Sequence, residues 1–123
     1  MNNGYRNLLV WQKSIDLAEA IYKLTRALPD DEKYGLTSQM RRAAVSIASN
    51  IAEGSKRSSD KDYRNFIVIA MGSAAELITQ LLVSYRLKYI PKADFEKSTA
   101  DLEEIERMLN GLRQRLDSGK KKT

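Results

Sequence analysis

Residues 41–57 read RRAAVSIASNIAEGSKR, a helical pattern with few large side chains. When the helix expected here, over 37–54, is placed on a wheel, its apolar residues fill one continuous arc of about 200°. These residues are Ala43, Ile47, Met40, Ile51, Ala44, Ala48, Ala52 and Val45. A helix on the core of a single chain needs an apolar stripe only a little wider than about 100°. The stretch therefore predicts a helix with more apolar surface than one core covers.

The next helix, expected over 59–89, has an equally wide apolar arc. Its members are Phe66, Leu77, Ala70, Tyr63, Leu81, Ala74, Ile67, Ile78, Met71, Leu82, Ala75 and Val68. Alanines recur at four-residue spacing in both helices, which allows neighbouring helices to approach closely. Tight packing inside a monomer explains the alanines without a partner, but it explains the width of the arcs less well. We therefore expect another copy of the chain to cover the surplus, in a homo-oligomer.

Two further helices flank this pair, over 8–28 and 92–117, because apolar residues recur there at spacings of three and four. The stripes are Val10, Ser14, Leu17, Ile21, Leu24 and Leu28 in the first, and Phe95, Ser98, Leu102, Ile105, Leu109, Leu112 and Leu116 in the second. Short connections between four helices predict a single all-α domain over 1–123, an up-and-down antiparallel four-helix bundle. A basic tail over 118–123 follows it.

Local signals suggest where the two middle helices begin and end. Thr37 is a plausible N-cap for the helix that follows it. Gly54 is expected to stop that helix at its C-terminus. Ser59 and Asp62 resemble a capping box with the shorter acid, which predicts a helix start at Ser59.

The polar residues of the two middle helices are expected to be structural. Arg41 falls inside the apolar arc, so it either reaches outward to water or pairs with a buried acid, for which Glu76 is the best candidate. Asn50 and Glu53 would then satisfy backbone groups or a neighbouring subunit. The sequence thus predicts a polar network or subunit interface that contains these four residues.

The composition excludes many kinds of catalytic site. Cysteine and histidine are both absent, so the chain builds no disulfide, thiolate nucleophile, Ser-His-Asp triad, histidine zinc site or Glu-x-x-His di-iron site. No glycine-rich phosphate loop is present either. Glu53 and Glu76 remain as a candidate carboxylate pair for acid–base chemistry. We expect no enzyme, no cofactor and no metal.

The start of the chain lacks the basic and then apolar layout of a signal peptide. The longest weakly charged stretch, over 65–85, contains Glu76 and several polar groups, too many for a membrane span. We expect a cytoplasmic protein with no membrane partner.

The net charge of +5 is unevenly distributed. Residues 36–66 hold six cations against three anions, and residues 113–123 hold five against one. The candidate nucleic-acid-binding residues are Arg42, Lys56, Arg57, Lys61, Arg64, Arg113 and Arg115, with the lysines of the tail. Such a surface attracts phosphates. The alternative is an oligomeric protein-interaction scaffold or adaptor without nucleic-acid binding, in which the charges serve solubility.

Three stretches of the chain resemble a known family. They are RNLLVWQKSIDLAEAIYKLT (6–25), EKYGLTSQMRRAAVSIASNIAEGSKR (32–57) and DYRNFIVIAMGSAAELITQL (62–81). The family is that of the four-helix bundle proteins encoded in 23S rRNA intervening sequences, and the resemblance extends from Arg6 to about Leu116. Its most specific elements are a QxRRAxxSIxxNIAEG-like block and a GSAxEL element. The block is matched at Gln39, Arg41, Arg42, Ala43, Ser46, Ile47, Asn50, Ile51, Ala52, Glu53 and Gly54, and the second element at Gly72, Ser73, Ala74, Glu76 and Leu77. One departure is Ala48, where the family often has proline, and it leaves the helix unkinked.

The resemblance implies a left-handed up-and-down bundle that assembles, typically as a pentameric ring. The chain is also more distantly similar to the accessory variability determinant proteins of diversity-generating retroelements, which form basic pentameric barrels that bind nucleic acid and a reverse transcriptase. The expected partners are therefore other copies of the chain, nucleic acid in the form of structured RNA, and a protein such as a reverse transcriptase. The family has no established biochemical activity, so the resemblance names no reaction.

Overall fold

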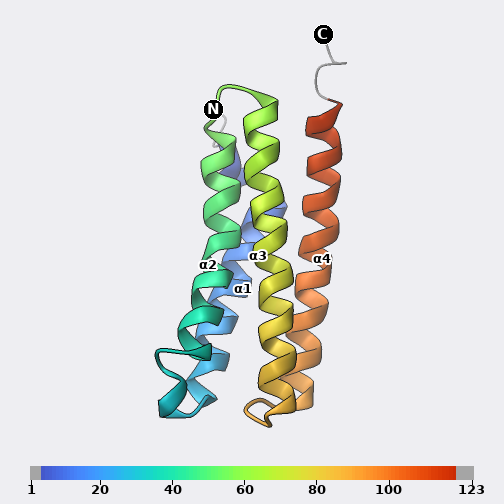
Figure 1. Ribbon diagram of the computed structural model, residues 1–123. Coiled ribbons are helices and arrows are strands. Elements are labelled where there is room, and N and C mark those ends of the chain that lie inside the picture. Colours follow the sequence, from blue (N-terminus) through green and yellow to red (C-terminus); the bar gives the residue numbers. More distant parts are fainter. Residues whose placement is uncertain (1–3, 119–123) are drawn as a thin grey trace.

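The computed structural model describes residues 4–118, and these residues form an all-α four-helix bundle (Figure 1). Neighbouring helices run in opposite directions, and each packs against the next, with the first and last also in contact. The helices are α1 (Leu9–Leu24), α2 (Leu36–Ser55), α3 (Asp60–Arg86) and α4 (Lys92–Asp117). Short 3₁₀ turns are η1 (Gly4–Asn7), η2 (Thr25–Ala27) and η3 (Asp30–Glu32). The expected up-and-down architecture is confirmed, and the lysines of the tail lie outside the described residues.

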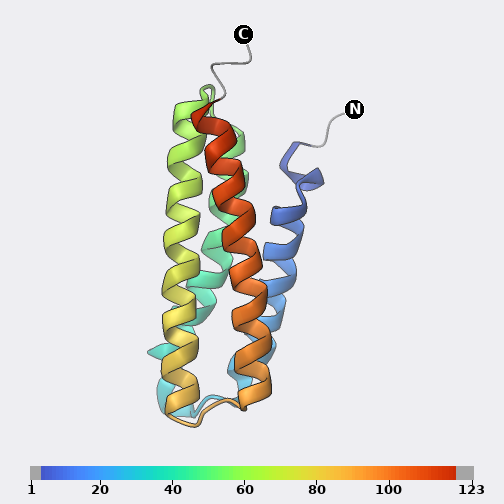
Figure 2. The same cartoon turned by 90° about the vertical axis from the view of Figure 1, so that its right-hand side faces the viewer.

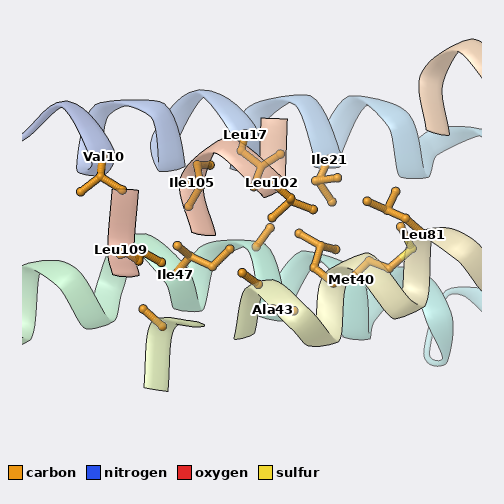
Figure 3. Close-up of a cluster of buried hydrophobic side chains, with 14 of the residues drawn as sticks. Val10, Leu17, Ile21, Met40, Ala43, Ile47, Leu81, Leu102, Ile105 and Leu109 are labelled. Carbon is orange, nitrogen blue, oxygen red and sulfur yellow. The ribbon is translucent and has the colours of Figure 1, made fainter. Parts of the chain in front are cut away.

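The predicted stripes of all four helices meet in one core. Figure 3 shows side chains from every helix converging on the bundle axis. Val10, Leu17 and Ile21 of α1 face Met40 and Ile47 of α2, with Leu81 of α3 and Leu102, Ile105 and Leu109 of α4. Ser14 is fully buried in the stripe of α1, where its hydroxyl donates to the carbonyl of Val10 at 2.7 Å. A small hydroxyl thus occupies a core position because its own helix accepts its hydrogen bond.

The start of α2 differs from the predicted N-cap. The helix begins at Leu36, so Thr37 lies inside it and is buried. Glu32 takes the role of the cap, because its Oε1 accepts the backbone N–H of Leu36 at 3.1 Å. Its Oε2 accepts the hydroxyl of Tyr89 at 3.1 Å. One carboxylate therefore completes the α2 N-terminus and ties it to the α3–α4 connection.

Gly54 does not stop α2, which continues to Ser55. A Cβ at this position would lie 2.7 Å from the Cβ of Phe66 and 3.0 Å from Cδ1 of Tyr63. The glycine is required because α3 approaches the backbone of α2 closely at this height. Close packing, and not a helix end, is the reason for the residue.

Both ends of α3 are capped. As predicted, Ser59 is the N-cap, and its hydroxyl accepts the backbone N–H of Asp62 at 3.1 Å. The helix ends at Arg86, earlier than expected, because Lys88 adopts the left-handed conformation with φ of 66°. The N–H of Tyr89 then reaches back to the carbonyl of Ser84 at 2.9 Å, the pattern of a Schellman motif. For α1, the regular helix likewise ends before the predicted boundary and continues as η2.

The apolar arcs of α2 and α3 are wider than the core that they line. Val68 of the predicted α3 arc is 40% exposed, and Val45 of the predicted α2 arc is 42% exposed. Ile69, which the predicted arc did not include, is 51% exposed. On the side of α3 that faces away from the bundle, the exposed apolar or small residues form a surface that we call the α3 outer face: Val68, Ile69, Gly72, Ala75, Leu82 and Val83. Contrary to the expectation from its polar groups, α3 is long and apolar enough to cross a membrane by length and composition alone, and 33% of its most apolar window is buried inside the bundle. The predicted surplus of apolar surface is therefore present on the single chain.

Candidate nucleic-acid interface

Three helix ends gather cations at one end of the bundle. The end of α2, the start of α3 and the end of α4 lie together with η1 (Figures 1 and 2). We call this region the basic end, with the residues Arg6, Lys56, Arg57, Lys61, Arg64, Arg113 and Arg115. Of the predicted nucleic-acid-binding residues that the structure describes, all except Arg42 belong to it; the lysines of the tail lie outside the described residues.

Acidic neighbours already pair with three of these cations. Arg57 lies 3.0 Å from Glu53 one turn earlier in the chain. Arg64 and Arg113 share the carboxylate of Asp117, which Arg113 contacts at 2.9 Å. These pairs are open to solvent, so each adds little stability, and a phosphate can compete for the arginine. Lys56, Lys61 and Arg115 form no ion pair within residues 4–118.

Aromatic rings lie among the cations of the basic end. The Tyr5 ring is flanked by the guanidinium of Arg6 at 5.9 Å and the ammonium of Lys56 at 5.7 Å. Trp11 meets the same ring edge-on, with centroids 5.1 Å apart. The Arg57 guanidinium lies 4.6 Å from the centre of the Phe66 ring. Rings beside cations suit nucleic acids because bases stack on the rings while phosphates meet the charges.

The sequence interpretation did not identify Tyr5 as a site residue. The tyrosine precedes Arg6 directly, but its second cation, Lys56, lies 51 positions further along the chain. Only the return of α2 to the end where the chain begins brings them together. The local Tyr-Arg pair is the only signal that the sequence offers.

Arg42 lies apart from the basic end. It precedes Lys56, the residue that follows the last turn of α2, by 14 residues, about 21 Å along the helix axis. There it lines a polar groove between α2 and α3, the α2/α3 groove, whose other residues are Gln39, Ala43, Ser46, Ser73 and Glu76. Within residues 4–118 neither Arg42 nor Glu76 forms an ion pair. The structure therefore does not join Arg42 to the other predicted phosphate contacts.

The predicted pairing of Arg41 with Glu76 is wrong. Arg41 points toward α1, where its Nε donates to the hydroxyl of Thr25 at 2.9 Å and its Nη2 donates to the carbonyl of Tyr22 at 3.3 Å. Its guanidinium also lies 4.7 Å from the centre of the Tyr22 ring. Glu76 is exposed on the other side of α2, in the α2/α3 groove. Arg41 thus joins α2 to α1 through neutral acceptors and an aromatic ring.

Asn50 and Glu53 have different environments. Asn50 donates to the backbone carbonyl of Ser46 at 2.8 Å and to its hydroxyl at 2.9 Å. The hydroxyls of Ser46 and Ser73 are 2.9 Å apart and link α2 to α3. Glu53 is exposed and contacts Arg57. Asn50 is therefore part of a small network between two helices, and Glu53 is not.

The candidate carboxylate pair is not assembled. Glu76 lies at the height of Arg42, and Glu53 is 11 residues further along α2, about 16 Å away along the helix axis. Across residues 4–118, no three acidic side chains come close enough to hold a metal ion. Tyr63, beside the basic end, has its pKa raised by burial, and Arg115 opposes that shift.

A family sequence model and a solved structure both match most of this chain. Residues 6–111 match the sequence model of the 23S rRNA-intervening sequence protein. A crystal structure of a protein of unknown function from the S23 ribosomal protein family of Bacteroides thetaiotaomicron superposes with a TM-score of 0.80 and 29% sequence identity. The superposition covers 86% of this chain and 96% of that one. The search of curated proteins gives no significant match.

Proposed function

The chain belongs to the family of 23S rRNA-intervening sequence proteins, and we propose that it acts without catalysis, as a homo-oligomer that binds nucleic acid through its basic end. The resemblance supports a pentameric ring as the assembly and structured RNA as the nucleic acid. The proposed location is cytoplasmic. The observation that carries the proposal is the gathering of cations and aromatic rings from distant parts of the chain at one end of the bundle, where Lys56, Lys61 and Arg115 form no ion pair among the described residues.

The contacts at the basic end suit a backbone that carries repeated charges. Lys56, Lys61 and Arg115 form no ion pair among the described residues, so phosphates meet them without displacing one. Tyr5 offers a half-buried ring for an unpaired base. No base-edge reading motif accompanies these groups, so we expect binding that depends on charge and shape more than on sequence. RNA is the first polyanion to test because the matching family and the similar crystal structure are both named for ribosomal RNA or a ribosomal protein.

A salt titration tests the proposal. Affinity for an RNA hairpin, a DNA duplex of equal length and single-stranded poly(U) is measured by filter binding from low to physiological salt. Each phosphate contact should lower log affinity by about 0.7 to 0.9 per unit of log salt. The double variant Lys61→Ala, Arg115→Ala should bind more weakly and lose about two contacts from the slope.

A matched pair of cations at the opposite end provides the control. Arg26→Ala, Lys92→Ala removes one arginine and one lysine from exposed positions there, and it should leave the affinity and the slope unchanged. If both double variants weaken binding equally, general charge is responsible and the basic end is not the site. If the natural protein binds none of the probes at about 50 mM salt, the proposal fails.

The second candidate function is an oligomeric scaffold for a protein, such as a reverse transcriptase. The exposure of the α3 outer face favours it, because apolar surface is what protein partners cover. A tagged pulldown after nuclease treatment separates the two functions. Retention of a defined protein, together with no salt-dependent RNA binding, would replace the first proposal.

A further inference from the structure

The α3 outer face has no cover in the single chain. It runs from Val68 to Val83, about 22 Å along the helix, and its side chains point away from the other three helices. Gly72 lies in this face, and a Cβ there would meet nothing within 4 Å. The single chain therefore gives no packing reason for glycine in the middle of a long helix, where it costs about 1 kcal/mol relative to alanine. A second backbone or side chain pressed against α3 would provide one.

A shallow apolar groove lies on another side of the bundle, between α1 and α2. We call it the α1/α2 groove. Its lining comes from η1, α1 and α2 and consists of Tyr5, Trp11, Ile15, Ala18, Val45, Ala48, Ser49 and Ala52, with Tyr5 at the end nearest the basic end. Its α2 wall consists of small residues, so a helix can approach closely. At one end of the groove, Lys56 lies over the Tyr5 ring. Beyond the other end, one turn before Val45 on the same side of α2, Arg41 lies over the Tyr22 ring.

The two surfaces have complementary charge. Glu76 lies next to the α3 outer face, exposed and without an ion pair among the described residues. Contact between two α3 outer faces around their centre would bring two Glu76 carboxylates toward each other. Contact with the α1/α2 groove instead brings Glu76 toward a surface that has Arg41 just beyond its end. The repulsion between two Glu76 carboxylates thus disfavours contact between two α3 outer faces. The attraction between Glu76 and Arg41 favours contact of the α3 outer face with the α1/α2 groove.

The heights of the charged residues agree with this second pairing. Glu76 and Arg42 line the same groove of one chain, so Glu76 lies level with Arg42 and its neighbour Arg41. A closed ring has no rise from one copy to the next. When bundles stand side by side around such a ring, Glu76 of one copy therefore meets the next copy at the height of Arg41.

The positions of the two surfaces also suit a closed ring. Because α3 packs against α2 and α4, it occupies the corner of the bundle diagonal to α1. The α3 outer face therefore points obliquely away from the α1/α2 groove, and not in the opposite direction. Repeating one contact between them turns each copy by the same angle, which closes a ring instead of extending a straight filament.

We propose that the α3 outer face of one copy docks into the α1/α2 groove of the next, in a head-to-tail contact that closes a ring. This inference rests on the proposed homo-oligomer and names its two surfaces. Both surfaces lie along the side of the bundle, so every copy stands the same way up. All the basic ends then lie on one face of the ring, where their positive fields add and form a single site for a polyanion.

Two substitutions each block one of the two surfaces that form the contact. Gly72→Glu places a charge in the α3 outer face, and Ser49→Glu places one in the α1/α2 groove. Gly72 has open space and Ser49 is exposed, so both chains should fold, which circular dichroism checks. Ala100→Glu adds the same side chain to the exposed side of α4 and is the control. Masses are measured by light scattering without nucleic acid.

Each blocked variant alone should have the 14.0 kDa mass of one chain, and Ala100→Glu should assemble like the natural protein. A mixture of Gly72→Glu and Ser49→Glu retains one intact contact, so it should form heterodimers of twice that mass. If Ser49→Glu alone forms dimers through α3, or if the mixture stays monomeric, the head-to-tail contact is wrong. Because no nucleic acid is present, a failure of RNA binding would leave this result unaffected.

Discussion

The two longest helices, α3 and α4, pack against each other and differ mainly on their outer sides. Both bury leucines completely, Leu77 in α3 and Leu109 in α4. Outside, α4 presents charge, such as the pair of Lys97 with Asp101 at 3.1 Å. The outside of α3 is largely apolar. Two helices that contribute equally to the core therefore differ in their solvent-facing sides. The charged outer side of α4 is well solvated by water, whereas the apolar outer side of α3 would be more stable against another protein surface.

The largest expected effect is on stability, and it tests whether the core-facing sides of α3 and α4 contribute equally to the free energy of unfolding. Leu77→Ala and Leu109→Ala each remove a fully buried side chain, so each should lower the free energy of unfolding by about 2 to 5 kcal/mol. Urea unfolding monitored by circular dichroism measures the loss. If the α3 truncation costs far less than the α4 truncation, the shared core does not depend on both helices.

The next largest effect is on self-association, and it tests whether the outer side of α3, but not that of α4, contacts another copy of the chain. Ile69→Glu puts a carboxylate on the α3 outer face, where a partner would have to bury it, so self-association should weaken by about a hundredfold or more. Arg107→Glu changes an exposed residue of α4 and should leave association unchanged. Sedimentation velocity over a concentration series compares them. Equal masses for the two variants would contradict the distinction between the helices.

A smaller effect is expected where α3 ends. Lys88 has a left-handed backbone conformation that glycine adopts without steric cost, so Lys88→Gly should raise the free energy of unfolding by about 1 kcal/mol. Arg86→Gly, at the last residue of the helix, should instead lower it, by less than about 1 kcal/mol. A loss of stability in both variants would mean that the Lys88 side chain matters more than its backbone conformation.

The smallest effect concerns an acid on α4. Burial raises the pKa of Glu106, and the nearby Glu103 charge adds to the shift. The folded chain therefore holds this proton more tightly than the unfolded chain does, so the group favours folding at acid pH and this contribution is lost as the pH rises through its titration. Glu106→Gln should slightly raise the melting temperature at neutral pH, with the difference vanishing in acid. A difference that does not change with pH would contradict this cause.

The features that depend on residue spacing within a single helix could be predicted from the sequence. The stripes that meet in the core, the Ser59 cap and the surplus apolar surface of α3 follow from the spacing of residues within one helix, and the structure confirms them. The two errors at the ends of α2 had different causes: the acid that caps the helix lies only four residues before it, whereas the contact that requires Gly54 comes from another helix. Thr37 lost the role of cap to Glu32, and Gly54 is required by contact with α3.

The candidate site shows the same limit. The density of basic residues in the sequence was enough to predict most of the basic end. The partner of Arg41, in contrast, depends on which helix packs against the side of α2 that carries Arg41. A helical wheel shows that Arg41 is in the apolar arc without showing that α1 and its Thr25 hydroxyl lie there. The contact of Tyr5 with Lys56 likewise requires knowing that both ends of the α1–α2 hairpin meet.

The account depends on another copy of the chain covering the α3 outer face. Sedimentation equilibrium of the natural protein, at micromolar concentration and without nucleic acid, tests this most directly. The account predicts a mass that is a whole multiple of 14.0 kDa and greater than two chains. A mass of 14.0 kDa at every concentration would show that water alone covers α3, and it would contradict the ring and the shared basic face.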